Sequence, residues 1–216
     1  MSLPVIVLGA GGHAKVLIDT LLESSAIIAG VTDPDPNLIG TRLLGVPVLG
    51  GDEVVSKFPQ SEICLVNGLG SVGLPIRRRE LFQRFKKSGY IFAKVVHPSA
   101  IIASDAELGE GTQVMAGAII QPGSRIGCNV IVNTKTSVDH DCVIGDHVHL
   151  APGVTLSGGV RMRNSVHVGS GVTVIQGIEI GNNSLIGAGS VVINNVPDSA
   201  EVSGVPARNI KIVTKK

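Results

Sequence analysis

Bulky aliphatic residues recur at every sixth position through the second half of the chain. Sixteen consecutive positions of this register hold only Val, Ile, Leu or Met: Ile102, Leu108, Val114, Ile120, Ile126, Val132, Val138, Ile144, Leu150, Leu156, Met162, Val168, Val174, Ile180, Ile186 and Val192. A period of two is typical of a strand and one of about 3.6 of a helix, whereas a period of six predicts a short strand, a corner and a return to the same inward position. Three such faces close a triangular coil of about 18 residues. We therefore expect residues 102–197 to form a parallel β-helix of a little over five coils.

The first part of the chain has a different pattern, in which apolar runs alternate with amphipathic ones. The runs predict strands and helices in turn: a strand over Val5–Leu8, a helix over Lys15–Glu23, a strand over Ala26–Val31, a strand over Ile63–Val66 and a charged helix over Arg77–Ser88. This alternation predicts an α/β domain, half of a Rossmann fold, with a parallel sheet and ligands at the carboxyl ends of its strands. We expect two domains, over residues 1–96 and 97–216.

A glycine turn follows the first expected strand. Gly9-x-Gly11-x-x-Ala14, with Asp33 at the end of the next strand, matches a dinucleotide-binding fingerprint. Fewer than 100 residues hold only about half of a dinucleotide fold, so a nucleotide or nucleotide sugar fits the domain better. The helix N-terminus after Gly12 can meet a phosphate, and Asp33 can accept hydrogen bonds from a ribose or base. The alternative is a tight turn that binds nothing.

Composition and charge narrow the function classes. The net charge of +1 favours neither nucleic acid nor an acidic membrane surface as a partner. One Tyr, four Phe and no Trp leave the core to aliphatic side chains, and three Cys without CxxC spacing indicate reduced thiols in the cytoplasm. The apolar start is expected to be a strand rather than a signal peptide, and no stretch has the length of a membrane span. A soluble cytoplasmic protein is expected.

A coil of 18 residues turns residue numbers into positions around the triangle. His149 and His167 differ by 18 and are expected to stack at one corner, with Ser170 and Ala188 stacked three residues further round. His140 lies nine residues from His149, half a turn away. The two cannot converge on one small group within a chain, but they can meet across an interface of a cyclic trimer.

His140 lies between Asp139 and Asp141. A carboxylate beside a histidine orients the ring and stabilises the imidazolium, as in many general bases. The alternatives are a solvated polar corner and a zinc site, for which the candidate ligands are His140, His147, His149 and His167. A passive spacer is a further reading of the repeat, but these polar side chains are poor choices for a passive wall.

Several motifs resemble one family of enzymes. They are Gly9-Ala-Gly-Gly-His-Ala-Lys-Val16, His97-Pro-Ser-Ala100, Asn133-Thr134, Val138-x-His-Asp-Cys-x-Ile-Gly145, Ile186-Gly-Ala-Gly-Ser190 and Gly204-Val-Pro-Ala-Arg208. Over nearly its whole length the chain resembles the left-handed β-helix sugar acyltransferases, specifically the bacterial nucleotide-4-amino-sugar N-acetyltransferases and the related sialic acid O-acetyltransferases. The resemblance implies a left-handed coil, acetyl-CoA as co-substrate and a homotrimer with active sites between subunits.

The resemblance also implies roles for single residues. His140 is the expected general base, and Asp141, which is Glu in some relatives, raises its basicity. His149 is placed at the acetyl end of acetyl-CoA with His167 beside it, and Ser170 and Ala188 line the pantetheine arm. The nucleotide sugar is expected on the front domain, at Gly11, Gly12, His13, Asp33, Pro34, Gly68 and Ile76.

The expected function is transfer of acetyl from acetyl-CoA to the 4-amino group of a nucleotide-linked 4-amino-4,6-dideoxy sugar, for bacterial surface glycans. No metal is expected, and no Cys or Ser is expected beside a base as an acyl-enzyme requires. O-acetylation of a sugar such as sialic acid is the first alternative. A zinc hydratase and a non-catalytic nucleotide-sugar binder are the others.

Overall fold

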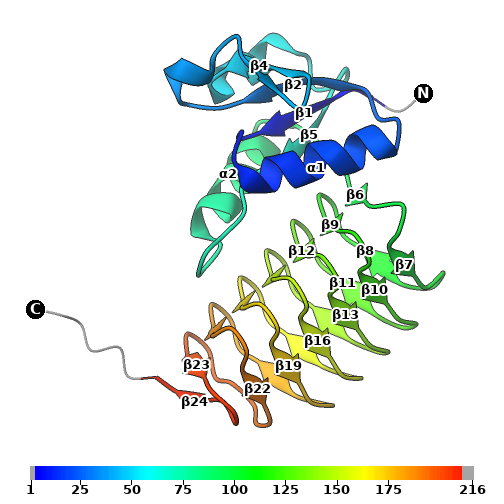
Figure 1. The fold of residues 1–216 in the computed structure, drawn as a ribbon, viewed down its shortest axis with the longest axis vertical. Helices are drawn as coiled ribbons and strands as arrows, with labels where there is room; N and C mark the ends of the chain where they lie inside the picture. The colour runs from blue at the N-terminus through cyan, green and yellow to red at the C-terminus, as the bar shows by residue number, and fades with distance from the viewer. Residues whose placement is uncertain (1–2, 211–216) are drawn as a thin grey trace, which may run out of the picture.

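The computed structural model describes residues 3–210, which form a front domain followed by a β-helix. Figure 1 shows the front domain at the top in blue and cyan, and the coils stacked below it from green to red. Helix α1 (Gly12–Glu23) lies between the front sheet and the first coils, and α2 (Ile76–Lys87) lies at one side. The fold class expected from the sequence is confirmed.

The front domain is a five-stranded sheet covered on both faces. Its strands are β1 (Val5–Leu8), β2 (Ile28–Thr32), β3 (Arg42–Leu43), β4 (Val46–Gly50) and β5 (Cys64–Asn67), in the order β3-β4-β2-β1-β5. Neighbours are parallel except β3, which pairs antiparallel with β4. Along β1, Val5 and Val7 pack on the side of α1, and Ile6 and Leu8 on the side of α2. Burial on both faces is typical of a parallel strand between two helical layers.

Element boundaries differ from the sequence expectation by one residue at each end of β5 and α2, and by more elsewhere. α1 begins at Gly12 instead of Lys15, because Gly11 is its N-cap and the helix follows the glycine turn directly. β2 begins at Ile28, two residues later than expected. β3, β4 and two short 3-10 helices, η1 (Pro36–Leu38) and η2 (Asp52–Lys57), lie where prolines and glycines interrupt any regular hydrophobic pattern.

The β-helix consists of short strands arranged in three sheets. The first sheet contains β7 (Ile101–Ile102), β10 (Ile119–Ile120), β13 (Ser137–Val138), β16 (Thr155–Leu156), β19 (Thr173–Val174) and β22 (Val191–Val192). The second contains β8 (Glu107–Leu108), β11 (Arg125–Ile126), β14 (Val143–Ile144), β17 (Arg161–Met162) and β20 (Glu179–Ile180). The third contains β6 (Val95–Val96), β9 (Gln113–Val114), β12 (Ile131–Val132), β15 (His149–Leu150), β18 (His167–Val168), β21 (Leu185–Ile186), β23 (Glu201–Ser203) and β24 (Arg208–Asn209).

The period of 18 residues is confirmed by the strand pairing. Ile119 pairs with Ser137, and His149 pairs with His167, each one coil on. From Val114 to Val192 every aliphatic anchor is at most 3% exposed, as the register requires; Val114, Ile126, Leu150 and Val168 are examples. Ile102 and Leu108 are only partly buried because their strands pair with a neighbouring coil on one side only.

Corners of the coil recur with the same regularity as the anchors. Every sixth residue from 111 to 189 has a positive φ. Most are glycines, and the others include Asn129, Asp141 and Asn183, types that tolerate this region better than most. Positions with a positive φ therefore alternate with the buried anchors along the whole β-helix.

Contacts between the domains are polar as well as apolar. The carboxylate of Glu110 accepts the backbone N–H of Phe92 at 2.8 Å and binds the ammonium of Lys86 at the same distance. Met115 of the β-helix is buried in the core beneath α1, and His97 lies 3.2 Å from Glu23 of α1. Among the described residues, neither helix has the length and apolar character needed to cross a membrane.

Candidate active site

His140 lies on an exposed corner of the β-helix between β13 and β14. Its Nδ1 is 2.9 Å from Oδ2 of Asp141, and its backbone N–H donates to Oδ1 of Asp139 at 2.8 Å. Asp141 holds one of the left-handed corner positions, with a φ of 59°. Since the carboxylate engages Nδ1, the ring nitrogen left free to take a proton is Nε2.

The carboxylates beside His140 raise its pKa above the ordinary value of 6.5. The hydrogen bond with Asp141 is the largest cause and the charge of Asp139 the second. A raised pKa makes the ring a stronger base and also means that the neutral form is lost at a higher pH than for an isolated histidine. If this ring acts as a base, the activity should fall as the pH is lowered, because protonation removes the neutral form.

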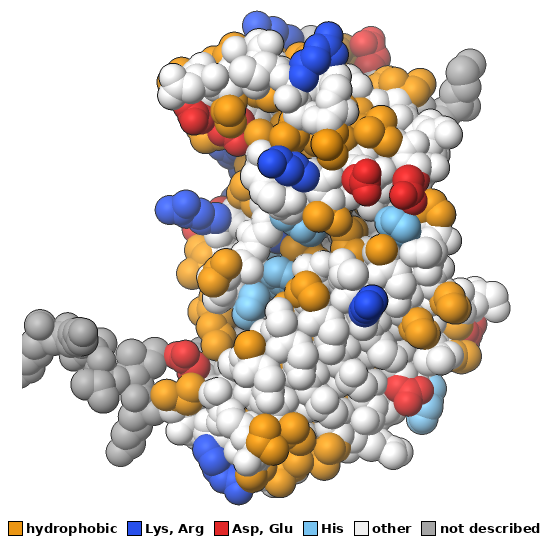
Figure 2. Space-filling model, in the orientation of Figure 1, with side chains coloured by type: hydrophobic (Ala, Val, Ile, Leu, Met, Phe, Trp, Pro, Cys, Tyr) orange, Lys and Arg blue, Asp and Glu red, His pale blue; other side chains and the backbone are white. Residues whose placement is uncertain are grey.

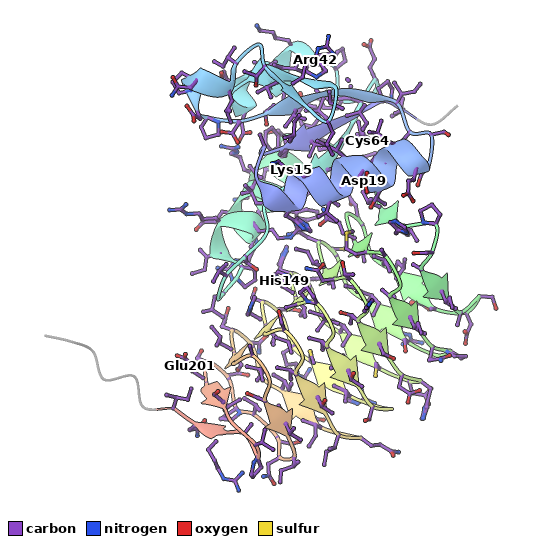
Figure 3. The ribbon with its side chains drawn as sticks, in the orientation of Figure 1. Lys15, Asp19, Arg42, Cys64, His149 and Glu201 are labelled. Atoms are coloured by element: carbon purple, nitrogen blue, oxygen red, sulfur yellow. The ribbon has the colours of Figure 1, made fainter. Side chains whose placement is uncertain are left out.

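A cavity of about 710 Å³ opens where the front domain meets the β-helix. Five residues expected to bind the nucleotide sugar line it from the front domain: Gly11, Gly12, His13, Asp33 and Gly68. The β-helix contributes Asn133, Thr134, His149 and Pro152. Figure 2 shows histidine side chains gathered in this hollow, and Figure 3 places His149 below α1. The expected acceptor and acetyl ends of the site thus meet in one cavity.

The glycine turn presents a free helix N-terminus to this cavity. Gly11 caps α1 without any side-chain hydrogen bond, so the first N–H groups of the helix are available to an anion. Asp33 holds the turn in place, because its Oδ2 accepts the N–H of Ala10 at 2.8 Å and its Oδ1 accepts that of Asp35 at 3.0 Å. Each carboxylate oxygen keeps a second lone pair for a ligand.

His13 joins the front domain to the β-helix through a short chain of hydrogen bonds. The amide of Gln113 donates to the carbonyl oxygen of Asn67 at 2.8 Å, so its oxygen accepts from Nε2 of His13, also at 2.8 Å. Burial, followed by the charge of Arg78, lowers the pKa of His13 to about 4. The ring is therefore neutral near pH 7, with its proton on Nε2.

His149 and His167 lie together as expected, but their position on the coil was predicted wrongly. Both begin strands of the third sheet, on its face, whereas the corners fall at the positive-φ residues such as His147. The rings contact edge to face with centroids 5.0 Å apart. Both side chains are nevertheless buried. They are covered by the loop of the front domain between β5 and α2, residues 68–75.

Ser71 of that covering loop contacts both histidines. Its Oγ is 2.7 Å from Nδ1 of His149 and 3.5 Å from Nδ1 of His167. Burial, then the charge of His167, lowers the pKa of His149 to about 2, and burial also lowers the pKa of His167. From the sequence, no serine was expected beside a base as an acyl-enzyme requires, and Ser71 is a serine beside a histidine. A ring with so low a pKa is nevertheless a poor base for activating a hydroxyl.

Arg78 fastens the same loop to the β-helix. Its Nη1 donates to the carbonyl oxygens of Asn67 and Leu69 at 2.8 and 2.7 Å, and its Nε donates to that of Asn129 at 3.4 Å. Nη2 has no hydrogen-bond partner among residues 3–210. Burial lowers the pKa of Arg78 to about 9, which leaves it charged near neutrality. The sequence gives no sign of this role, since Arg78 is one of three consecutive arginines in a helix that reads as solvent-exposed.

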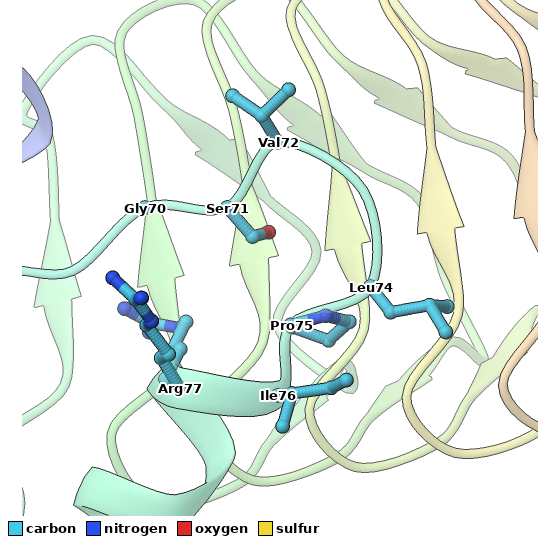
Figure 4. A pocket seen from close by; sticks show the side chains of 8 residues that line it. Gly70, Ser71, Val72, Leu74, Pro75, Ile76 and Arg77 are labelled. Carbon is cyan, nitrogen blue, oxygen red and sulfur yellow. The ribbon is translucent and has the colours of Figure 1, made fainter.

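A second cavity, of about 500 Å³, lies along the loop and the start of α2. Figure 4 shows the residues around it, which are Gly70, Ser71, Val72, Leu74, Pro75, Ile76, Arg77 and Arg78. Ile76 therefore borders this second cavity and is not among the residues that line the first. Pro34 is exposed beside Asp33 and does not line the first cavity either.

Other expected site residues lie away from the cavity. Ser170 and Ala188 stack on an exposed corner, where the N–H of Gly189 donates to the carbonyl oxygen of Ser170 at 2.8 Å. His140 is also outside the cavity lining, on a different corner from these two. Within the described part of the chain, no three His, Cys, Asp or Glu side chains are grouped so that they could hold a metal ion.

The buried histidines make the fold sensitive to acid. Once unfolded, His13 and His149 return to a pKa near 6.5, so below that pH the unfolded chain binds protons that the folded chain does not. At 1.36 kcal/mol per pKa unit, we expect the free energy of unfolding to fall by up to about 3 kcal/mol for each histidine between pH 6.5 and 4. Denaturant titrations across this range measure the loss.

The control for this prediction is His140, whose pKa is shifted in the opposite direction. His149→Gln should flatten the pH dependence, whereas His140→Gln should not, because the raised pKa of His140 adds stability below 6.5 and loses it as the pH rises. Equal pH dependence in wild type and His149→Gln would contradict the assignment of a neutral buried ring.

Fold and site together define a class of protein, a hexapeptide-repeat transferase with an α/β front domain. The family model for the PglD N-terminal domain matches residues 4–85, and that for the bacterial transferase hexapeptide (six repeats) matches residues 123–158. Perosamine N-acetyltransferase PerB from Caulobacter crescentus, solved with CoA and GDP-perosamine, has 37% identity and a TM-score of 0.89, covering 96% of this chain and 97% of that one. The chain belongs to the PglD-like hexapeptide-repeat sugar N-acetyltransferases.

Other relatives agree with this assignment. The acetyltransferase domain of PglB from Neisseria gonorrhoeae FA1090, solved with acetyl coenzyme A, is 31% identical with a TM-score of 0.88, covering 97% of this chain and 100% of that one. UDP-N-acetylbacillosamine N-acetyltransferase of Bacillus subtilis (strain 168) is 38% identical over 115 residues, 52% of this chain and 51% of that protein. The match therefore spans about half the length of that curated relative.

Proposed function

We propose that this chain transfers acetyl from acetyl-CoA to the 4-amino group of a nucleotide-linked 4-amino-4,6-dideoxy sugar. The observation that carries the proposal is the His140–Asp141 pair. The carboxylate raises the pKa of His140 and leaves Nε2 of this exposed ring free, on a β-helix of the kind that the family shares. The relatives described above, which are named for perosamine and bacillosamine N-acetylation, favour an amine over a hydroxyl acceptor. We further propose that the enzyme acts in the cytoplasm, where its three free thiols stay reduced.

The chemistry asked of the protein is modest because a thioester is already activated. The neutral sugar amine attacks the acetyl carbonyl carbon, a C–N bond forms, and the C–S bond breaks to release CoA. His140 takes the proton from the attacking nitrogen, a contribution of about 10²–10⁴-fold. A backbone N–H or His149 stabilises the oxyanion of the tetrahedral intermediate. Holding both substrates in line contributes more than the proton transfer.

The cavity between the domains supports the choice of acceptor. It is polar at the free N-terminus of α1, which suits a phosphate, and it carries the Asp33 carboxylate, which suits the hydroxyls of a ribose or the N–H groups of a base. On the opposite wall His149 belongs to the β-helix. A nucleotide held by the front domain therefore extends its sugar toward the acetyl end of the site.

A panel assay tests this function. Release of the CoA thiol is measured with UDP-, GDP- and dTDP-linked 4-amino-4,6-dideoxy sugars, each beside its 4-hydroxy counterpart and beside free sialic acid. We expect turnover with at least one amino sugar and none with the matching hydroxy sugar. Turnover with sialic acid alone would establish the O-acetyltransferase instead. Binding of a nucleotide sugar without any CoA release would leave a non-catalytic binder.

We propose that the active site is shared between subunits of a homotrimer. His140 lies on the corner between the first and second sheets, and His149 lies on the third sheet, so one β-helix carries them on different sides. His140 is also absent from the lining of the cavity that holds His149. If both act on one acetyl group, one of them must come from a neighbouring chain.

Mixed trimers provide a test of the shared site. We expect that His140→Ala chains refolded with His149→Ala chains regain part of the activity that each variant lacks alone, because some interfaces then carry both intact residues. The matched control mixes His140→Ala with Asp141→Ala, two lesions on the same corner, which should restore nothing. An active monomer, or equal recovery in both mixtures, would rule the arrangement out.

Ser71 gives a test of direct attack. We expect Ser71→Ala to keep turnover within about tenfold of wild type, because a histidine with a pKa of about 2 cannot draw the serine proton near pH 7. Steady-state rates and the mass of the protein after incubation with acetyl-CoA are measured together. A loss as large as that of His140→Ala, with an acetyl adduct on wild-type Ser71, would replace direct attack by an acyl-enzyme.

A further inference from the structure

Gly158 lies directly against the ring of His140. It follows His140 by one coil, and the N–H of its neighbour Gly159 donates to the carbonyl oxygen of His140 at 2.8 Å. A Cβ built on Gly158 would lie 2.5 Å from Cε1 and 2.5 Å from Nε2 of His140, and 3.1 Å from Cδ2. Non-bonded carbon atoms approach no closer than about 3.5 Å without repulsion. The imidazole thus occupies the space that any other residue at 158 would fill.

In all the remaining coils the same corner position holds a residue with a side chain. Its successive occupants are Ser104, Pro122, His140, Gly158, Gln176 and Asn194. Ser104, Pro122, Gln176 and Asn194 are exposed, whereas Gly158 is buried. The φ of Gly158 lies outside the left-handed region, so the backbone does not require a glycine there. The neighbouring ring, and not the turn, accounts for the glycine.

Asp141 is seated in a similar way on the preceding coil. A Cβ on Gly123 would lie 2.5 Å from Oδ1 of Asp141. Gly123, however, has a φ of 73°, which favours glycine for the backbone alone. A substitution at Gly123 would therefore combine backbone strain with the clash, whereas one at Gly158 tests the clash alone.

We infer that Gly158 is a positioning residue for His140, which seats the ring against Asp141 and keeps Nε2 uncovered. In the ring position that lies over the glycine, Nδ1 is 2.9 Å from Oδ2 of Asp141. A methyl group at 158 would push the ring toward solvent, where an exposed corner side chain is free to swing, and would cover the edge that carries Nε2. This inference rests on the proposed role of His140 as the base.

Gly158→Ala tests the inference through kinetics and through the ring itself. We expect kcat to fall by roughly 100-fold, as small misplacements of a reacting group do, while the KM for acetyl-CoA stays nearly unchanged. In an NMR titration of the ring protons without substrates, the pKa of His140 should move from its raised value down toward 6.5 as contact with Asp141 is lost. Gln176→Ala, at the same position one coil further on, should change neither quantity.

The outcomes separate this inference from the proposed function. An unchanged pKa of His140 in Gly158→Ala would overturn the inference, whether kcat is unchanged or KM for acetyl-CoA rises because the methyl blocks the substrate. A lowered pKa would support the seating even if His140→Ala proved fully active, a result that would refute only the base. Thermal unfolding provides a further check, since Gly158→Ala should lower Tm less in a His140→Ala background, where no ring competes for the space.

Discussion

Replacing His140 by alanine should lower turnover by roughly 100-fold or more, the usual contribution of a general base. The fold, the proposed trimer and the affinity for acetyl-CoA should survive, because the side chain lies on an exposed corner and packs into no core. Rates of CoA release under saturating acetyl-CoA measure the effect. Near-normal turnover in a folded His140→Ala protein would remove this residue from the mechanism.

Asp141→Asn is the matched variant for this prediction. The amide keeps the shape of the side chain but removes the charge and the strong hydrogen bond that raise the pKa of His140. Turnover should fall less than in His140→Ala, and the acidic limb of the pH–rate profile should move to lower pH. If the acidic limb does not move in Asp141→Asn, a group other than His140 controls the fall in rate at low pH.

Truncating a central anchor of the β-helix should have the largest effect on stability. Leu150 is fully buried in the middle of the coil, where coils above and below leave little room for collapse. Leu150→Ala should therefore lower the free energy of unfolding by about 2–5 kcal/mol. Denaturant unfolding at a fixed protein concentration measures it.

Leu108→Ala is the control for the central anchor. It removes the same atoms from the same register, but Leu108 is only partly buried in the first coil. We expect a clearly smaller loss, because part of the side chain is already in water. Equal losses at the two positions would mean that the end coil is as tightly packed as the centre.

The repeat was predictable because each coil obeys the same local rule. Anchors such as Val114 and Leu150 are buried at a fixed interval, so the register follows from residue type alone, and His149 and His167 could be paired without a structure. Their placement at a corner was wrong because the hexad pattern marks inward positions and does not say where a corner falls. β3 and β4 escaped prediction because β3 has only two residues and Pro47 interrupts the apolar run of β4.

Contacts between the domains were beyond the sequence pattern. Ser71 meets His149 across 78 positions of chain, and Arg78 meets the carbonyl oxygen of Asn129 across 51. No periodicity connects such pairs, since the docking of the two domains decides them. Gly158 differs from these, because it follows His140 by one coil and could have been found by the same arithmetic that paired the histidines.

The last coil carries a consequence for association. A stack of parallel strands ends in edges whose free N–H and carbonyl groups are templates for a strand of another molecule. Here each final edge is already covered: Val196 bridges to β20, Gly204 and Ala207 exchange backbone hydrogen bonds with Val191 of β22, and β23 pairs with β21. β24 then turns back antiparallel on β23 and presents Arg208 and Asn209 to solvent. Among residues 3–210 the last long edges of the three sheets are therefore paired and only the two-residue strand β24 is left as an edge, which disfavours end-to-end joining of copies into fibres.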